Sequence, residues 1–339
     1  MRYGTIAIIG RSNVGKSTFL NKAIGMPLAI VSRLPQTTRD TLLGVVNSGE
    51  AQLAFIDTPG LHKPKNELGR RMNHEAIESL RNADAAVFMT DALELEAVPD
   101  AADPAGAKSG AAKTRAGKKV GKARKKAGKT RSGSKRGSST ELSDAELIAQ
   151  LPTDLPTVLV LNKIDRLRDK TRLLPVLEAL GARHPFAAVV PISAKTGDGV
   201  DRVLAEVAQL LPEQESRFAP DEVTDRPVAF FAREYIREQV LTLASREVPH
   251  AVAVTLDSIE ESTQGLHVSA TIHVEKLGQR AILVGHGGEM VREIGKAARA
   301  RLAELTEQPV HLKLFVRITE RWRNVPLQLA ELGYPTERS

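Results

Sequence analysis

The chain contains no cysteine, which excludes both a disulfide scaffold and a thiolate metal site for its 339 residues. Aromatic residues make up only 4% of the chain, so little material is available for a surface that stacks nucleic-acid bases. No apolar run approaches the roughly 20 residues of a membrane span, and the first run ends at Gly10, too early for a secretory leader. We therefore expect a cytoplasmic globular protein, whose 42% hydrophobic residues provide a sizeable core.

One stretch of the chain lacks acidic residues and holds many of the basic ones. Residues 104–140 contain 9 Lys, 4 Arg and no Asp or Glu, whereas the whole chain has a net charge of +7. The rest of the chain is therefore net acidic, and the pI of 9.6 does not indicate a basic folded domain. Val120 is the only large apolar residue of the stretch, so burial cannot offset its ordering entropy. We predict a low-complexity, disordered insertion at residues 98–141.

Outside the insertion, short apolar runs alternate with stretches of helical spacing. The expected strands cover residues 5–9, 42–46, 52–56, 85–89, 157–161 and 187–192. The expected helices follow Gly15, cover 67–81, lie near Asp144, and cover 173–180 and 200–211. Strands that alternate with helices favour a mostly parallel sheet with helices on both faces. The pattern predicts one α/β domain over residues 1–211.

After residue 211, the order of helical and alternating apolar patterns changes. Residues 212–227 are polar and contain three prolines, which is typical of a linker. A helix at 228–244, two alternating runs, two helical stretches and a last alternating run at 310–318 follow. The second helical stretch carries an apolar stripe of Val291, Ile294, Ala298, Leu302 and Leu305. We predict a smaller α+β domain over residues 228–334.

The first helix is preceded by the pattern G-x-x-x-x-G-K-S, which lies between a strand and a helix as phosphate binding requires. Glycines let successive N–H groups point inward, and the helix N-terminus adds positive charge. We expect Lys16 to neutralise the β- and γ-phosphates and the Ser17 hydroxyl to hold Mg²⁺. The expected nucleotide-binding residues of this loop are Gly10, Arg11, Ser12, Asn13, Val14, Gly15, Lys16, Ser17 and Thr18.

Three further motifs follow strand ends, where open α/β sheets bind their ligands. They are Asp57, Thr58, Pro59 and Gly60; Asn162, Lys163, Ile164 and Asp165; and Ser193, Ala194 and Lys195. Asp57 can reach Mg²⁺ through water. Asp165 can accept hydrogen bonds from both the ring N–H and the amino group of guanine, a pattern that adenine does not offer. The sequence therefore predicts GTP rather than ATP as the substrate.

These motifs, together with Gln36-Thr37-Thr38-Arg39-Asp40 and Leu61, resemble the Era family of bacterial GTPases within the TrmE-Era-EngA group. The likeness runs from residue 4 to about residue 334 without the insertion. It implies that Thr38 closes on Mg²⁺ and the γ-phosphate, with the adjacent Thr37 as the alternative. The implied catalytic residues are Lys16, Thr38, Gly60 and Asn13, and the implied metal ligands are Ser17, Thr38 and Asp57.

Leu61 departs from Ras-type GTPases, which have a water-orienting glutamine directly after this glycine. Leucine offers no hydrogen bond, so we expect slow hydrolysis unless another charge reaches the phosphates. Relatives of this group recruit K⁺ through an asparagine of the phosphate loop, which Asn13 matches. Either K⁺ takes the place of an arginine finger here, or Asn13 only braces its loop.

The turn Gly285-His286-Gly287-Gly288 resembles the GXXG loop of a KH domain, which clamps about four nucleotides of single-stranded RNA. The ending, with 310–316, Trp322 and 332–334, resembles the C-terminal signature of Era. The loop lacks the family's usual basic residue. The candidates for phosphate contact are therefore Arg292, Lys296 and Arg299 on the following helix, whose alternative interpretation is an ordinary solvated face.

The resemblance implies a GTP-hydrolysing switch that binds the 3′ end of small-subunit ribosomal RNA and acts in maturation of the 30S subunit. The expected ligands are GTP or GDP, Mg²⁺ and this RNA, and the protein is expected to be monomeric. One alternative is a GTPase recruited to the inner face of the cell membrane, whose basic insertion binds anionic lipid. Another is an RNA-binding assembly factor with an inactive nucleotide site. The insertion is either a tether for RNA phosphates or a tolerated loop.

Overall fold

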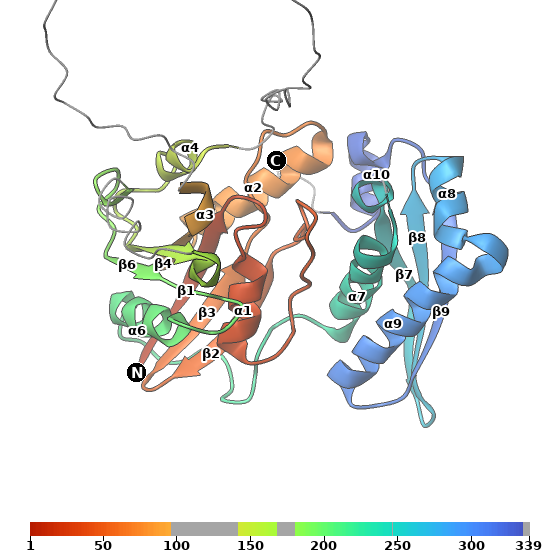
Figure 1. The fold of residues 1–339 in the computed structure, drawn as a ribbon. Coiled ribbons are helices and arrows are strands. Elements are labelled where there is room, and N and C mark those ends of the chain that lie inside the picture. Colours follow the sequence, from red (N-terminus) through yellow and green to blue (C-terminus); the bar gives the residue numbers. More distant parts are fainter. Residues whose placement is uncertain (96–141, 168–179, 246, 335–339) are drawn as a thin grey trace, which may run out of the picture.

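The computed structural model describes residues 1–95, 142–167, 180–245 and 247–334. The predicted basic insertion and most of the helix predicted at 173–180 lie outside these residues. The described chain forms a six-stranded sheet and a three-stranded sheet, each covered by helices (Figure 1). Within the described ranges, no helix combines the length and the apolar character that crossing a membrane requires.

The larger sheet has the order β2-β3-β1-β4-β5-β6. Five strands run parallel: β1 (Arg2–Gly10), β3 (Ala51–Asp57), β4 (Ala85–Asp91), β5 (Thr157–Asn162) and β6 (Ala188–Pro191). The edge strand β2 (Leu42–Ser48) is antiparallel to β3 because a two-residue turn joins them, with Gly49 at φ 58°. The expected mostly parallel sheet is therefore confirmed, with one antiparallel edge.

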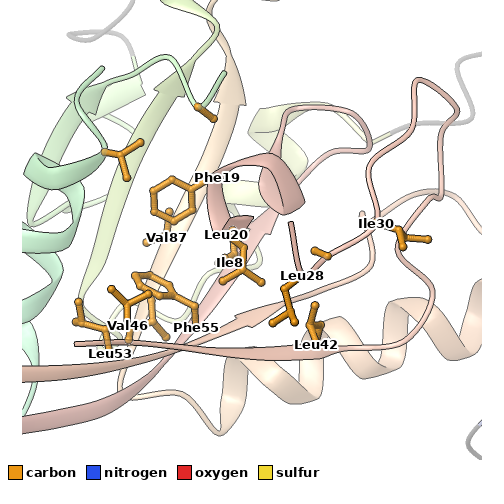
Figure 2. Packing of buried hydrophobic residues seen from close by; sticks show 14 of the residues in the cluster. Ile8, Phe19, Leu20, Leu28, Ile30, Leu42, Val46, Leu53, Phe55 and Val87 are labelled. Carbon is orange, nitrogen blue, oxygen red and sulfur yellow. The ribbon is translucent and has the colours of Figure 1, made fainter. Parts of the chain in front are cut away.

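Helices cover both faces of this sheet, as predicted. They are α1 (Lys16–Ile24), α2 (Glu67–Arg81), the short α3 (Ala92–Leu95), α4 (Asp144–Ile148) and α6 (Val200–Leu210). Along β1, Ile6 and Ile8 enter a cluster with residues of α1 and α6, whereas Ala7 and Ile9 enter a second cluster with residues of α2 and α4. Figure 2 shows the first cluster, in which the rings of Phe19 and Phe55 meet edge to face at 5.6 Å. A strand buried on both faces explains the near-continuous apolar run at the start of the chain.

The segment predicted as a linker is fastened along the sheet. The amide of Val45 in β2 donates to the carbonyl of Val223 at 2.8 Å, and the Gln52 side chain donates to the carbonyl of Phe218 at 2.9 Å. The segment therefore binds both β2 and β3, and its contact with Val45 satisfies a backbone group of the edge strand β2.

The second sheet has the order β7-β8-β9. Strand β7 (Ala253–Ser262) is antiparallel to β8 (Gly265–Val274), and β9 (Val310–Ile318) is parallel to β8. Helices α7 (Val228–Leu243), α8 (Leu277–Val284) and α9 (Glu289–Thr306) contribute to its core. The expected order of helices and strands is observed. Helix α10 (Pro326–Glu331) was not expected from the sequence, because its six residues are too few to show a helical period.

The two halves share a buried cluster. Leu68 and Met72 of α2 pack with Trp322, Leu332 and Tyr334 near the C-terminus. Trp322 is completely buried, its Nε1 donates to the carbonyl of Ala251 at 3.1 Å, and its ring stacks on Tyr334. The C-terminal residues therefore join the second sheet to the first domain.

We expect the stability contributed by Glu75 of α2 to depend on pH. Burial, and after it the charge of Asp40, raises the pKa of this carboxyl to about 7, with Arg226 opposing the shift. The unfolded chain ionises the group near 4.5, so ionisation penalises the folded state increasingly as pH rises from there past 7. Glu75→Gln should therefore raise the melting temperature by a few degrees at pH 8 and hardly change it at pH 5. Glu78→Gln, at an exposed position of the same helix, is the control; equal shifts at both pH values for Glu75→Gln would contradict the assignment.

Candidate functional site

The loop between β1 and α1 requires its two glycines. Gly10 has φ 154°, and a Cβ there would lie 2.3 Å from the carbonyl oxygen of Met89. Gly15 has φ 107°, and its Cβ would lie 2.2 Å from Nδ2 of Asn162. The buried Lys16 at the start of α1 donates through Nζ to the carbonyls of Gly10 and Arg11, at 3.2 and 3.0 Å. The loop therefore curls around the Lys16 ammonium group, which suits it to phosphate binding.

Three side chains from distant parts of the chain meet beside this loop. Ser17 donates to Oδ2 of Asp57 at 2.6 Å, and the Thr38 hydroxyl lies 3.0 Å from the Ser17 hydroxyl and 3.3 Å from the same carboxylate oxygen. The Thr37 hydroxyl instead donates to the carbonyl of Leu34 at 2.7 Å. The structure thus brings Thr38, and not Thr37, to the other two expected metal ligands.

The environment of Asp57 suits a divalent cation. Burial raises the pKa of this carboxyl, while Lys16 and the hydroxyls of Ser17 and Thr38 act in the opposite direction. Oδ1 of Asp57 is buried and has no hydrogen-bond partner among the described residues. No group of three His, Cys, Asp or Glu side chains in the described ranges could hold a metal by itself. Hydroxyl, carboxylate and phosphate oxygens together are ligands that Mg²⁺ prefers, so the residues fit this ion.

The opposite end of the pocket lies at the ends of β5 and β6. Asn162 is buried; its Nδ2 donates to the carbonyl of Val14 at 2.8 Å, and its Oδ1 accepts from the amide of Ala194 at 2.9 Å. The Ser193 hydroxyl donates to Oδ1 of Asp165 at 2.7 Å, while Asp165 itself is exposed. Asp165 is therefore oriented at the mouth of the pocket, with an oxygen available to an incoming base.

Lys163 links the two ends of the pocket and also pairs with Asp91, a residue that was not expected from the sequence. Its ammonium group donates to the carbonyl of Asn13 at 2.7 Å and pairs with Asp91 at 2.6 Å. Asp91 is the last residue of β4, so the strand-end rule that found the other motifs could also have found it.

A cavity of about 820 Å³ joins these groups. Its lining includes twelve of the predicted nucleotide-binding residues: Ser12, Asn13, Gly15, Lys16, Ser17, Thr18, Gly60, Asn162, Lys163, Asp165, Ala194 and Lys195. Gln36, Thr37 and Thr38 of the predicted switch motif also line it, and so do residues that were not expected from the sequence: Ile30, Val31, Ser32, Arg33 and Arg166. Residues 30–33 carry no motif beyond their place just before the switch motif, which begins at Gln36.

The remaining predicted residues do not line the cavity but pack under the loops that do. Val14 and Ser193 are buried, and the Thr58 hydroxyl donates to the carbonyl of Ile8 at 2.7 Å, which fixes the loop with Pro59. Burial raises the pKa of the Asp144 carboxyl. Arg11 lies close enough to that carboxyl to oppose the shift in part, as does the hydrogen bond from Thr90. These residues shape the loops that carry the lining groups.

The expectation of a K⁺ site rests on Asn13 and Leu61, and the structure shows the surroundings of both residues. Nδ2 of Asn13 donates to the carbonyl of Arg33 at 3.2 Å, so the phosphate loop touches the switch segment here. Leu61 is only 3% exposed and packs in the apolar cluster with Ile9. The side chain that follows Gly60 is therefore part of the core.

A second groove, of about 400 Å³, lies on the three-stranded sheet. It is lined by Val291, Arg292, Glu293, Gly295, Lys296 and Arg299 of α9 and by Leu312 and Leu314 of β9. Val291 was predicted in the core stripe and lines this groove instead. The loop before α9 includes His286 and has three glycines in the left-handed region: Gly285, Gly287 and Gly288. Arg292 folds back and donates to the carbonyls of Gly287 and Gly288, at 2.6 and 3.1 Å.

Comparison with known proteins identifies both halves of the chain. A family described as "50S ribosome-binding GTPase" matches residues 5–163, and the KH domain family matches residues 247–323. The GTPase Era of Lactobacillus delbrueckii subsp. bulgaricus is 36% identical over 332 residues, which cover 98% of this chain and 95% of the relative. The GTPase Era of Xanthomonas oryzae pv. oryzae is 37% identical over 98% of this chain and 97% of its own length.

Two solved structures extend the likeness to three dimensions. One is an Era variant from Aquifex aeolicus bound to GDP and AlF₄⁻, and the other is Era in complex with MgGDPNP and nucleotides 1506–1542 of 16S ribosomal RNA. Each superposes with a TM-score of 0.82 at 32% identity and covers 99% of this chain and 100% of the other. Because its sequence and its fold match those of Era proteins over almost their whole length, this chain belongs to the Era family of GTPases, with a P-loop GTPase domain followed by a KH domain.

Proposed function

We propose that this protein is a GTP-hydrolysing switch that binds small-subunit ribosomal RNA near its 3′ end through its KH domain and acts in assembly of the 30S subunit. The observation that carries the GTPase assignment is one cavity lined by Ser17 and Thr38 at the phosphate-loop end and by Asp165 at the other end. Asp57 supports the first end through its hydrogen bond with Ser17, and Ser193 supports the second through its hydrogen bond with Asp165. The complex of a relative with MgGDPNP and a 16S RNA fragment supports the RNA assignment.

The proposed domain boundaries follow the two sheets, with the GTPase domain on the larger sheet and the KH domain on the smaller one. Residues 1–211 form the GTPase domain, with the insertion at 98–141; residues 212–227 connect the domains; and residues 228–334 form the KH domain. We propose that the protein acts in the cytoplasm as a monomer. Recruitment to the inner face of the cell membrane is the alternative, and flotation with anionic liposomes tests it.

We assign the reaction to attack of water on the γ-phosphate of GTP. Lys16 neutralises charge on the β- and γ-phosphates, and Gly60, which lines the same cavity, would offer its backbone N–H to the γ-phosphate. Ser17, Thr38 and Asp57 would hold Mg²⁺, which supplies positive charge where the phosphates develop negative charge. The chain contributes positioning and electrostatics rather than a covalent intermediate.

Guanine recognition is assigned to the loops after β5 and β6. Asp165 accepts from the base, Ser193 orients that carboxylate, and the remaining members of the site are Asn162, Lys163, Ala194 and Lys195. Asn162 connects this end to the phosphate loop through the carbonyl of Val14. The base and the phosphates are therefore held by one connected framework.

The assignment of Asp165 predicts a change of substrate. Asp165→Asn removes the acceptor for the guanine ring N–H and amino group, so kcat/KM for GTP should fall by about 100-fold or more, while xanthosine triphosphate becomes the better substrate. Steady-state turnover with both nucleotides measures this. Asp198→Asn, an exposed carboxylate in the neighbouring loop, should retain the preference for GTP. If Asp165→Asn still prefers GTP, the base pocket lies elsewhere.

We also propose that K⁺ assists hydrolysis beside Asn13. The position of Asn13 supports this: it lines the cavity beside Arg33, and its side-chain oxygen and the carbonyl of Arg33 are the kind of oxygen ligands that K⁺ needs. The buried Leu61 leaves the usual water-orienting position without a hydrogen-bonding group.

This assignment predicts a cation-specific rate. Turnover in KCl should exceed turnover in NaCl of equal ionic strength by about tenfold or more, since one well-placed charge contributes that much to transition-state stabilisation. Asn13→Ala should remove the difference without abolishing GDP binding. Equal rates of the unaltered protein in the two salts would show that Asn13 only braces its loop.

The RNA-binding groove is assigned to the loop 285–288 with Arg292, Lys296 and Arg299. Glycines allow close approach of a sugar-phosphate chain, and the three cations line one side of the groove. Glu293 opposes them, so phosphate attraction depends on the cations of α9 rather than on the loop.

Lys296→Gln tests the groove. The variant should bind a single-stranded RNA from the 3′ end of small-subunit ribosomal RNA more weakly, and the slope of log affinity against log salt should become shallower by about 0.7. Fluorescence anisotropy over a salt series measures both quantities. Lys65→Gln, an exposed lysine of the GTPase domain, serves as the control. An unchanged slope for Lys296→Gln would place the RNA elsewhere.

A further inference from the structure

Arg39 belongs to the switch segment of the GTPase domain, yet its guanidinium is buried in the KH domain. Only 4% of Arg39 is exposed. Nη1 donates to the carbonyl of Val252 at 2.5 Å and to the hydroxyl of Tyr334 at 3.1 Å. Nη2 lies 3.5 and 3.4 Å from the carbonyls of Pro249 and His250. All four acceptors belong to the KH domain.

The packing around the guanidinium restricts it further. Its central carbon lies 5.8 Å from the ring centroid of Trp322, within the range of a cation–π contact. Trp322 is itself fixed by its hydrogen bond to the carbonyl of Ala251 and by stacking on Tyr334. The acceptors of Arg39 therefore come from a buried, well-packed part of the KH domain.

The rest of the switch segment is fastened to the same domain on both sides of Thr38. Asp40 pairs with Arg233 of α7 at 3.0 Å. The amide of Val31 donates to Glu238 of α7 at 3.1 Å, and Arg301 of α9 donates to the carbonyl of Pro27 at 2.7 Å. The KH domain thus holds the segment before and after the residue that faces Ser17 and Asp57.

Adjacent Cα atoms are 3.8 Å apart, so the position of Arg39 restricts that of Thr38 directly. A misplacement of about 1 Å in a reacting site can lower the rate by about 100-fold. An anchor on Arg39 is therefore well placed to control the Thr38 hydroxyl.

We propose that Arg39 is a positioning residue for GTP hydrolysis: anchored on the carbonyls of the KH domain, it holds Thr38 toward Mg²⁺ and the γ-phosphate. The KH domain is then a structural part of the GTPase site, although none of its described residues, 228–245 and 247–334, lines the nucleotide cavity. This inference rests on the proposed role of Thr38 as the switch threonine.

Positioning and simple stabilisation of the fold have different consequences for nucleotide binding. Only a nucleotide with a γ-phosphate engages Thr38, whereas GDP depends on the phosphate loop and the base pocket. Loss of the anchor should therefore weaken binding of GDPNP and leave that of GDP nearly unchanged. Damage to the fold would weaken both together.

The experiment compares full-length variants at saturating Mg²⁺. For Arg39→Gln we expect about tenfold weaker binding of GDPNP, a change of less than about twofold for GDP, and a fall in kcat of about 10- to 100-fold with a small change in KM. Arg39→Lys should recover part of the loss, since it retains the charge but not the forked donors. Tyr334→Phe removes one acceptor and should shift the GDPNP-to-GDP affinity ratio in the same direction, by about two- to fivefold.

Two further variants make the result decisive. Arg323→Gln removes a guanidinium that contacts the same carbonyl of His250 but pairs with Glu275 inside the KH domain, and it should retain the wild-type ratio. Thr38→Ala reports on the site itself and should lower the ratio at least as much as Arg39→Gln.

The inference is overturned if Arg39→Gln leaves the GDPNP-to-GDP affinity ratio unchanged, which includes an equal loss of affinity for both nucleotides. If Thr38→Ala lowers that ratio in the same experiment, the proposed site itself still stands. An unchanged ratio in Thr38→Ala overturns the proposed site and the inference with it. If Arg39→Gln does not fold, Tyr334→Phe decides, because loss of one hydroxyl group leaves the packing in place; a wild-type ratio in that variant overturns the inference.

Discussion

The nucleotide pocket depends on one buried amide, the side chain of Asn162. It donates to the phosphate loop at the carbonyl of Val14 and accepts from the backbone amides of Lys163 and Ala194, at 2.7 and 2.9 Å. A buried amide that satisfies three backbone groups fixes their relative positions, since loss of any one would leave an unpaired polar group. Gly15 is glycine for the same reason, because a side chain there would collide with this amide. The parallel sheet brings the loops together, and Asn162 sets the spacing between them.

Much of this site could be predicted from the sequence because its chemistry is encoded locally. A glycine-rich turn, a carboxylate at a strand end and a polar residue after the next strand are short patterns with a stated physical role. The choice between Thr37 and Thr38 was not encoded in this way. Both are β-branched hydroxyl residues at adjacent positions, and only the folded segment shows which one faces Ser17.

The contacts between the domains could not be predicted from the sequence. The acceptors of Arg39 are mainly backbone carbonyls about 210 residues away, and a carbonyl leaves no trace in the sequence. Residues 212–227 matched the composition of a linker, yet several of their groups complete the edge strand β2. Composition indicates that a segment does not form its own core. It does not indicate whether another element binds that segment.

The buried charge of Arg39 explains why the interface between the GTPase and KH domains can serve a nucleotide-dependent switch. A buried ion is weak evidence for stability, since removing it from water costs about as much as its contacts return. Arg39 accordingly contributes orientation more than free energy: its planar guanidinium must meet acceptors in fixed directions, and carbonyls held by Trp322 and its neighbours allow few arrangements. Asp40 and Arg233 restrict the same segment through an ion pair at the next residue. An interface of this kind specifies one docked geometry without binding so tightly that the segment could never leave it, which is what a nucleotide-dependent element requires.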